Sequence, residues 1–417
     1  MHTAVASPRS NRGNGTLAAL AQPVVRRRRR AWLGALAGVV LLVAGCGQAA
    51  KKPIRPPSRG SGIPASLAGA DLKGLSWIGQ SDGWALFGQR CPGASCARLL
   101  HTSDGGIHWH LLPVPPATVV SGIYECQKGA CVSGVSFANR KVGYLYGPAL
   151  LMSTDSGRSW QAQRGRQVEA LAVSGGRVYR VAYGHVGCPG PCRPVLQVAP
   201  TGSTAWRTVI GQLAPPGRSA TAQIVASGSS LLVALFGSQA GPVPAYASLY
   251  RSSNGGSSWE RHRDPCSGRG PHRKRQEEDL TALAAAAGRV VAGLCTPHLG
   301  TGGFVIKSTD SGASWRTDGA LPHVQFPHLI AAASSTTLAV STGPMGGGGV
   351  FTAELLISTD GGHHWHLAAT DRQHLTGAGA PAWLGFQDST VGRWIGDPHG
   401  VWVTHRAGTG WTRTAFP

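Results

Sequence analysis

The sequence predicts an all-β protein, a seven-bladed β-propeller with four-stranded antiparallel blades, preceded by a signal peptide and a linker. Two observations lead to this fold. An eight-residue segment that ends in tryptophan occurs seven times, at intervals of 46 to 56 residues. Two short apolar runs, separated by small or polar residues, lie upstream of each copy. A repeat of about 50 residues is typical of solenoids, propellers and similar arrays.

The octet has one pattern in its five best copies. A hydroxyl residue comes first, Asp or Asn third, Gly fifth and Trp eighth, as in "STDSGRSW" and "SSNGGSSW". The pattern residues are Asp104, Gly106, Trp109, Asp155, Gly157, Trp160, Asn254, Gly256, Trp259, Asp310, Gly312, Trp315, Asp360, Gly362 and Trp365. Two weaker copies, "APTGSTAW" and "THRAGTGW", keep the length and end at Trp206 and Trp411.

Each octet residue has a role in a tight turn. The acid can accept hydrogen bonds from backbone N–H groups of the turn, and the glycine supplies a positive φ. The tryptophan begins the next strand and buries a large apolar face. Because packing devices are repeated far more often than catalytic groups, we predict structural octets and no catalytic residue among them.

The segments upstream of the octets predict β-hairpins. "SWIGQSDGWALFG" (76–88), "VSFANRKVGYLYG" (135–147) and "LGFQDSTVGRWIG" (384–396) each place an aromatic residue before a closing glycine. A strand before the octet and another after it bring each repeat to four strands. "QEEDLTALAAAAG" (276–288) has some helical character, but its place in the repeat predicts a strand from Leu280.

On these motifs the chain resembles two related groups of proteins. The octets resemble the Asp-box, or bacterial neuraminidase repeat, and their pairing with "GW" and "GY" hairpins is similar to the photosystem II assembly-factor propeller family. The resemblance covers roughly residues 62–417. It implies a propeller and a scaffold or assembly role around membrane proteins. Sialidases, xyloglucanases and sortilin-type receptors also carry Asp-boxes, so the motif does not transfer an activity.

The amino terminus predicts export and a lipid anchor. Arg26–Arg30 form a basic block, and an apolar run from Ala31 to Ala44 leads into "VAGC". We therefore expect a lipoprotein-type signal peptide over 1–45, with cleavage before Cys46 and lipid attachment to its sulfur. An ordinary signal peptide or a short anchor helix is the alternative. Residues 46–66 have the composition of a flexible linker, and residues 67–417 form the propeller.

The cysteine count agrees with an oxidising compartment outside the cytoplasm. Without Cys46, eight cysteines remain and predict disulfides, with a metal or redox site as the alternative. The candidate pairs are Cys91 with Cys96, Cys126 with Cys131, Cys188 with Cys192, and Cys266 with Cys295. The two-residue spacings of zinc knuckles are absent, so we expect no metal and no cofactor.

The charge predicts an anionic partner. The formal net charge is +21, and removal of seven arginines with the signal peptide leaves +14. Residues 269–279, "RGPHRKRQEED", are expected to form an exposed loop, with these candidates for partner binding: Arg269, Arg273, Lys274 and Arg275. Outside a cell, such charge suits a protein or an anionic envelope polymer as partner. The membrane is a further expected partner, which the protein contacts through its lipid anchor. Nucleic acid is not expected, and a merely solvated basic face is the plain alternative.

A carbohydrate-active enzyme, sialidase-like or another glycoside hydrolase, is the second hypothesis. No "RIP" element of the sialidase type occurs, and the acids outside the octets show no spacing that selects a catalytic pair. These acids are Glu125, Glu169, Asp318, Glu354, Asp371 and Asp397. "GQSDG" (79–83) matches a nucleophile elbow but lies in a predicted hairpin, and "HHWH" (363–366) fits surface histidines better than a metal site. We therefore expect a binding scaffold without catalytic residues.

Overall fold

The computed structural model describes residues 65–91, 94–120, 130–184, 193–214, 220–237, 247–269, 278–287, 289–297, 302–322, 324, 326–343, 349–375 and 383–416. The chain divides into two units, Met1–Ser58 and Arg59–Pro417, and all of the described residues belong to the second. The predicted signal peptide, Cys46 and most of the linker lie outside the described residues. In the part of the chain that is described, no helix has the length and apolar character needed to cross a membrane.

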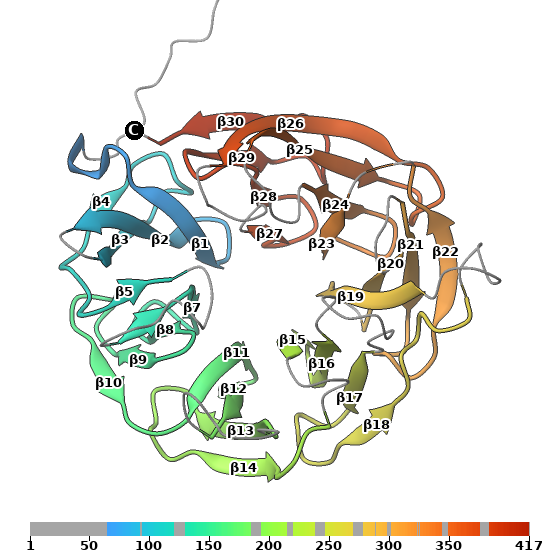
Figure 1. Ribbon diagram of the computed structural model, residues 1–417, viewed down its shortest axis with the longest axis horizontal. Coiled ribbons are helices and arrows are strands. Elements are labelled where there is room, and N and C mark those ends of the chain that lie inside the picture. The colour runs from blue at the N-terminus through green and yellow to red at the C-terminus, as the bar shows by residue number, and fades with distance from the viewer. Residues whose placement is uncertain are drawn as a thin grey trace, which may run out of the picture. The chain divides into compact units, whose positions relative to one another are not determined.

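Seven sheets, in which the four strands of each blade pair antiparallel, form a ring, which confirms the predicted propeller (Figure 1). Blade 1 follows a short 3-10 helix, η1 (Ala65–Leu67), and contains β1 (Asp71–Ile78), β2 (Asp82–Cys91), β3 (Ala94–Thr102) and β4 (His110–Leu111). Blade 2 contains β7 (Gly134–Phe137), β8 (Gly143–Tyr146), β9 (Leu150–Ser153) and β10 (Gln161–Gln163). Blade 3 contains β11 (Gln167–Ser174), β12 (Arg177–Tyr183), β13 (Val195–Pro200) and β14 (Arg207–Ile210).

The other four blades have the same order. Blade 4 contains β15 (Ala220–Ser227), β16 (Ser230–Gly237), β17 (Ser248–Ser252) and β18 (Glu260–His262). Blade 5 contains β19 (Glu278–Ala285), β20 (Val291–Pro297), β21 (Phe304–Ser308) and β22 (Arg316–Ala320). Blade 6 contains β23 (Pro327–Ala332), β24 (Leu338–Thr342), β25 (Gly349–Ser358) and β26 (His366–Leu375). Blade 7 contains β27 (Trp383–Phe386), β28 (Gly392–Ile395), β29 (Gly400–Thr404) and β30 (Thr412–Ala415).

The first strand of each blade is innermost and the fourth lies on the outer rim. Each octet joins the third strand to the fourth, and its tryptophan directly precedes the fourth strand. The segment with helical character forms β19, a strand as predicted, which begins two residues before Leu280.

The sheet of blade 1 has six strands, two more than predicted. The additional strands are β5 (Thr118–Val119), which pairs antiparallel with β3, and β6 (Cys131–Val132), which pairs parallel with β5. β4 pairs only with Leu100 and His101 of β3. The other end of β3 therefore keeps free backbone groups, and β5 satisfies them at Cys96.

The octets form closed hydrogen-bonded turns, as the octet of blade 2 illustrates. Ser153 Oγ donates to Asp155 Oδ1 (2.8 Å) and accepts from the N–H of Gly157 (2.8 Å). Asp155 also binds the hydroxyl and the N–H of Ser159, and these bonds lower its pKa to about 2. Trp160 Nε1 donates to Gly157 O (3.1 Å). The bonds among hydroxyl, acid or amide, and glycine recur in blades 1, 4, 5 and 6.

In six of the seven octets two successive residues adopt the left-handed conformation, and in the octet of blade 3 only Gly202 does. The fifth position has a φ of +88° at Gly157, and the fourth position is also left-handed, even where it is Ser156, Ser311 or Ala407. Only small residues occur at this fourth position in those copies. The turn geometry is therefore strong enough to hold side chains in a conformation that costs about 1 kcal/mol or more.

A side chain of each blade contacts the octet of the next blade. The indole of Trp84 in blade 1 donates to Ser156 O in the octet of blade 2 (3.2 Å). Tyr179 of blade 3 donates to Gly255 O in the octet of blade 4 (2.8 Å). Tyr144 of blade 2, at the matching place on its strand, accepts a hydrogen bond from the octet segment of blade 3 (2.8 Å). The three aromatic residues therefore hold adjacent blades together.

In blades 4, 5 and 6 the residue at the matching place on the second strand is aliphatic. A residue of the third strand contacts the octet of the next blade instead. Arg251 of blade 4 donates to a carbonyl in the octet of blade 5 (3.0 Å), and buried Lys307 of blade 5 reaches one in the octet of blade 6 (3.4 Å). Ile357 of blade 6 lies against Gly408 in the octet of blade 7. The same contact is thus made by hydrogen bonds or by apolar packing around the ring.

The ring closes between blades 7 and 1 without exchange of a strand. The N–H of Leu72 donates to Pro398 O (2.9 Å). Arg393 of β28 donates to Gly105 O in the octet of blade 1 (3.0 Å), and its guanidinium lies 3.3 Å from the ring centre of Trp77. The closing interface therefore uses the same octet contact as the others, reinforced by a cation–π interaction.

Two of the predicted disulfides are confirmed. Cys91 bonds to Cys96 across the β2–β3 hairpin (Cα–Cα 5.9 Å), and Cys266 bonds to Cys295 (5.6 Å). Cys131 is also disulfide-bonded. Three of the predicted disulfide cysteines lie outside the described residues: Cys126, Cys188 and Cys192.

We expect Gly157→Ala to lower the free energy of unfolding by about 1–3 kcal/mol. A Cβ there would lie 3.0 Å from Leu99 and 3.1 Å from Leu112, in a left-handed conformation. Gly211→Ala is the control, because a Cβ at Gly211 meets nothing within 4 Å, and its expected change is within about 0.5 kcal/mol. Urea denaturation measures both variants; equal destabilisation would contradict the role of the glycine.

We expect Phe416→Ala to lower the free energy of unfolding by about 3–5 kcal/mol. Its ring is buried at the closing interface and contacts Phe87 and Trp109, with centroid distances of 5.2 and 6.2 Å. Leu367→Ala removes an apolar side chain that is 54% exposed and is the control, with little change expected. Thermal unfolding of the two variants decides whether the closing interface limits stability.

Candidate functional site

Exposed arginines follow the outer rim of three consecutive blades. We call them the rim arginines; they lie on or just after β10, β14 and β18 (Figure 1). They are Arg164, Arg207, Arg261 and Arg263, and each is exposed. Within the described ranges, none of them forms an ion pair with a carboxylate. The rim of blades 2–4 therefore presents positive charge that the described acids do not neutralise.

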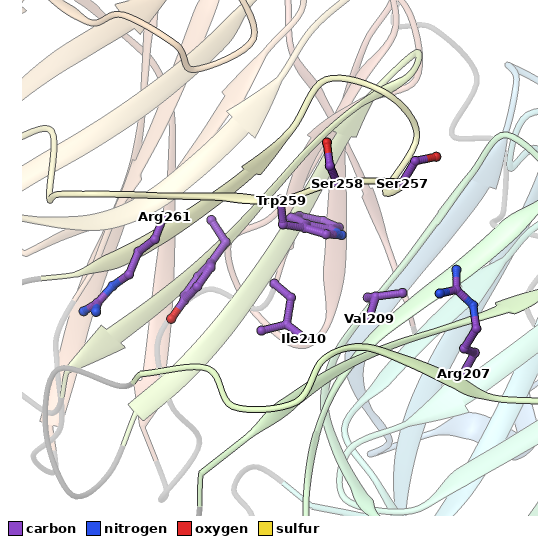
Figure 2. Close-up of a pocket in the computed structure, with 8 residues that line it drawn as sticks. Arg207, Val209, Ile210, Ser257, Ser258, Trp259 and Arg261 are labelled. Atoms are coloured by element: carbon purple, nitrogen blue, oxygen red, sulfur yellow. The ribbon is translucent and has the colours of Figure 1, made fainter.

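A pocket of about 290 Å³ opens between blades 3 and 4 within this rim. We call it the interblade pocket. Val209 and Ile210 of β14 form one side, and Trp259 faces them from the octet of blade 4 (Figure 2). Arg207 and Arg261 lie at opposite ends in this view. The remaining lining residues are Tyr250, Ser257 and Ser258. The pocket thus combines an apolar floor with a cation at each end.

The walls of the interblade pocket are held in place by backbone contacts. Trp259 Nε1 donates to Gly256 O (3.2 Å), which fixes the indole on its own turn. Buried Tyr250 accepts a hydrogen bond from the N–H of Ala214 (2.8 Å), just after β14. Because both aromatic rings are anchored, the apolar surface is preformed rather than created by a ligand.

The arginines at the pocket ends have free donors. Arg207 has no hydrogen-bond or ion-pair partner among the residues that the structure describes, and Arg261 has only a long contact to Ser248 Oγ (3.4 Å). The nearby acid Glu260 lies close to Arg251 (3.5 Å) and His262 (3.6 Å) instead. Both guanidinium groups are therefore available to a carboxylate from outside the chain.

The sequence-predicted basic loop is placed only in part. Arg269 is exposed and donates to Trp315 O (2.9 Å). The other three candidates lie outside the described residues: Arg273, Lys274 and Arg275. The acidic end of the loop was predicted wrongly, because Glu278 and Asp279 are buried at the start of β19, where Glu278 pairs with Pro297.

Two of the acids outside the octets lie together in the structure, although not as a glycosidase pair. Asp371 and Asp397 hydrogen-bond to each other, and Arg413 binds both of them, at 3.3 and 2.5 Å. Burial and the neighbouring carboxyl group raise the pKa of Asp371. Glycosidases hold their carboxyl groups about 5–10 Å apart around the sugar. Asp371 and Asp397 are buried and directly hydrogen-bonded, so a sugar has no room between them. The pair joins blades 6 and 7.

Two further loose acids have other environments. Asp318 is buried and pairs with Lys307 (2.6 Å) and Arg316 (3.1 Å). Glu354 is half-buried on β25. Glu125 lies outside the described residues. Neither Asp318 nor Glu354 has a second carboxylate as a partner in the described ranges.

A sialidase-type site pairs a tyrosine nucleophile with a carboxylate, and among the described acids Glu169, close to Tyr146, comes nearest to this arrangement. It is the extra residue of a bulge in β11, the innermost strand of blade 3. Burial raises its pKa to about 7. Burial also raises the pKa of Tyr146, and the charge of Glu169 raises it further. A sialidase-like site would also need arginines around this pair. No arginine in the described ranges is hydrogen-bonded or ion-paired with either residue.

The histidines of the octets bind acids of their own turns. His108 Nδ1 lies 2.6 Å from Asp104 Oδ2, and His364 Nδ1 lies 2.5 Å from Asp360 Oδ2. Neither His363 nor His366 adds a neighbouring ligand, and no metal-binding group of three or more such side chains occurs among the described residues. These histidines extend the hydrogen bonding of the turns.

No protein-family model matches the chain, and no curated protein is significantly similar to it. Among solved structures, it is similar to YCF48 from Cyanidioschyzon merolae, with a TM-score of 0.50 and 15% identity over 81% of this chain and 95% of that one. YCF48 bound to D1 peptide gives 0.48 and 14%, over 81% and 93%. The GH74 enzyme of Niastella koreensis gives 0.35 and 13%, over 82% and 65%. Likeness of this degree shows the propeller fold alone and does not choose between scaffold and enzyme.

We expect Glu169→Gln to raise the free energy of unfolding at pH 8 by about 1–3 kcal/mol. The folded protein holds the proton of Glu169 up to a pKa of about 7, whereas the ordinary value is 4.5. The stabilising effect of this proton is complete below pH 4.5 and is lost as the pH rises through 7. Urea denaturation at pH 5 and pH 8 measures the difference.

The control for this experiment is Glu354→Gln, which removes another half-buried glutamate. If the gap between Glu169→Gln and the wild type did not widen from pH 5 to pH 8, the burial of Glu169 as a protonated acid would be wrong. A gap of the same size in the control would assign the effect to net charge instead.

Proposed function

We propose that this protein is a non-catalytic binding scaffold, held at the outer face of the bacterial cell membrane by a lipid on Cys46. Its propeller binds an anionic macromolecule along the rim of blades 2–4. The observation that carries this proposal is the run of four exposed rim arginines without carboxylate partners among the described residues. Unpaired surface cations attract anions over long distances and orient them before contact.

The placement of the acids supports an anionic partner. The octet acids accept hydrogen bonds inside their own turns, as Asp155 does, while Asp318, Asp371 and Asp397 are buried in ion pairs. On the rim of blades 2–4 the described acid Glu260 lies close to Arg251 and His262 rather than to a rim arginine, so the rim arginines remain available to an anionic partner.

The proposed anchor places this binding surface close to the bilayer. A flexible linker of residues 47–66 has a typical end-to-end distance of about 25 Å. The propeller would therefore sample partners at the membrane surface or in the adjoining envelope. Such a tether raises the local concentration of the binding surface without adding a contact.

The arrangement of acids favours binding over hydrolysis. The directly bonded pair of Asp371 and Asp397 has no space for a sugar, and Glu169 lacks arginine partners in the described ranges. No step of the proposed function needs a metal or a cofactor.

The proposal predicts salt-sensitive binding of a polyanion. We expect the full chain, purified in detergent, to bind poly-glutamate about 10-fold or more weakly at 300 mM salt than at 50 mM. Replacing Arg164 and Arg263 together by alanine should weaken binding at low salt by about threefold or more. Fluorescence anisotropy of labelled poly-glutamate measures both effects.

The control is Lys141→Ala, which removes an exposed cation from the β7–β8 hairpin, away from the rim strands. If binding did not depend on the salt concentration, or if it fell equally in the control, the rim would not be the binding surface. A screen of glycans for hydrolysis tests the enzyme hypothesis. Turnover that disappears in Glu169→Gln would replace the scaffold by an enzyme.

A further inference from the structure

We propose that the interblade pocket binds an apolar side chain of a partner protein that carries carboxylates on both sides of it. This inference deepens the proposed function and rests on it. The occupant is an acidic protein segment rather than an anionic polymer, because the pocket offers an apolar floor that only a side chain of a protein would fill.

The apolar floor is the first argument. Val209 and Ile210 are half-buried on an outer strand that is otherwise exposed, and Trp259 faces them across the gap. Tryptophan, tyrosine and arginine are enriched among the few residues that carry most of the binding energy at protein interfaces. A glycan or phosphate polymer carries charge but no large apolar group, so it would leave the apolar floor of the pocket exposed to water.

The size of the pocket is the second argument. Sites for drug-sized ligands or cofactors span about 300–1,000 Å³, and this pocket measures about 290 Å³. This volume is at the lower limit of that range, and it leaves room for a large side chain of a longer segment. The segment would continue past both ends, where Arg207 and Arg261 can each bind a carboxylate in a bidentate manner.

The octet beside the pocket differs from the other good copies in a way that fits an anion. It has Asn254 where the others have aspartate, so it brings no negative charge to the pocket. Asn254 Oδ1 accepts the N–H groups of Ser257 (3.1 Å) and Ser258 (3.0 Å), which fixes the amide orientation. Its Nδ2 donates to Ser258 Oγ (2.9 Å).

The asparagine reverses one hydrogen bond relative to the aspartate octets. In blades 2 and 5 the serine at this position, Ser159 or Ser314, donates its proton to the aspartate. Ser258 accepts instead, and its own hydroxyl proton is free for an acceptor on the ligand. One substitution therefore removes a negative charge and creates a donor at the edge of the pocket.

The test uses the full chain in detergent and two synthetic peptides. One has a phenylalanine between acidic residues, and the other has serine in place of the phenylalanine. We expect the phenylalanine peptide to bind about 10-fold more tightly. Asn254→Asp restores the common octet chemistry but should weaken this peptide about fivefold or more. Ile210→Ser should abolish the preference for phenylalanine.

Asn139→Asp is the matched control. Asn139 also accepts backbone N–H groups in a turn, on the β7–β8 hairpin, away from the lining residues. It should leave binding unchanged. Thermal unfolding of each variant shows that the propeller remains folded.

The outcomes separate this inference from the function on which it rests. Equal binding of both peptides, with rim-dependent binding of poly-glutamate, overturns the inference and leaves the scaffold in place. Unchanged binding by Asn254→Asp also overturns it. If neither peptide nor poly-glutamate binds, both proposals are wrong.

Discussion

The structure depends on the contact between each octet turn and the blade before it. The turn is made rigid by its own hydroxyl, acid and glycine, and a side chain of the preceding blade then binds its backbone. Each blade therefore interacts mainly with its two neighbours, as in other repeat proteins. A local turn, specified by eight residues, in this way sets the spacing of sheets that lie far apart in the sequence.

The sequence allowed the seven blades to be predicted because the octets and hairpins are local and periodic. The contacts between blades could not be predicted, since one position holds Trp84, Tyr144, Tyr179 or Arg393 and the same task passes to Arg251 or Lys307 elsewhere. Because these side chains differ chemically, the sequence contains no motif for the contact between blades. The extra strands of blade 1 could not be predicted, because β5 pairs with a part of β3 that β4 leaves free and β6 pairs with β5. No local sequence pattern marks either pairing.

The candidate site shows a similar division. The basic character of the propeller could be predicted from composition, but the charge was assigned to residues 269–279, of which only the ends are described. The interblade pocket combines β14 with an octet about 50 residues later, so no local sequence pattern predicts it. Asn254 was visible in the sequence as a variant of the octet. Its effect on the pocket depends on a contact that only the structure shows, the hydrogen bond that its amide donates to Ser258.

The closing of the ring without strand exchange has an evolutionary consequence. The interface between blades 7 and 1 is built from the same kind of contact as the interfaces inside the chain. No blade is divided between the two ends, so the gene could begin at any blade and still encode the same circle. Duplication or loss of a whole repeat would likewise leave intact blades, and the number of blades is then limited by how tightly the circle can curve.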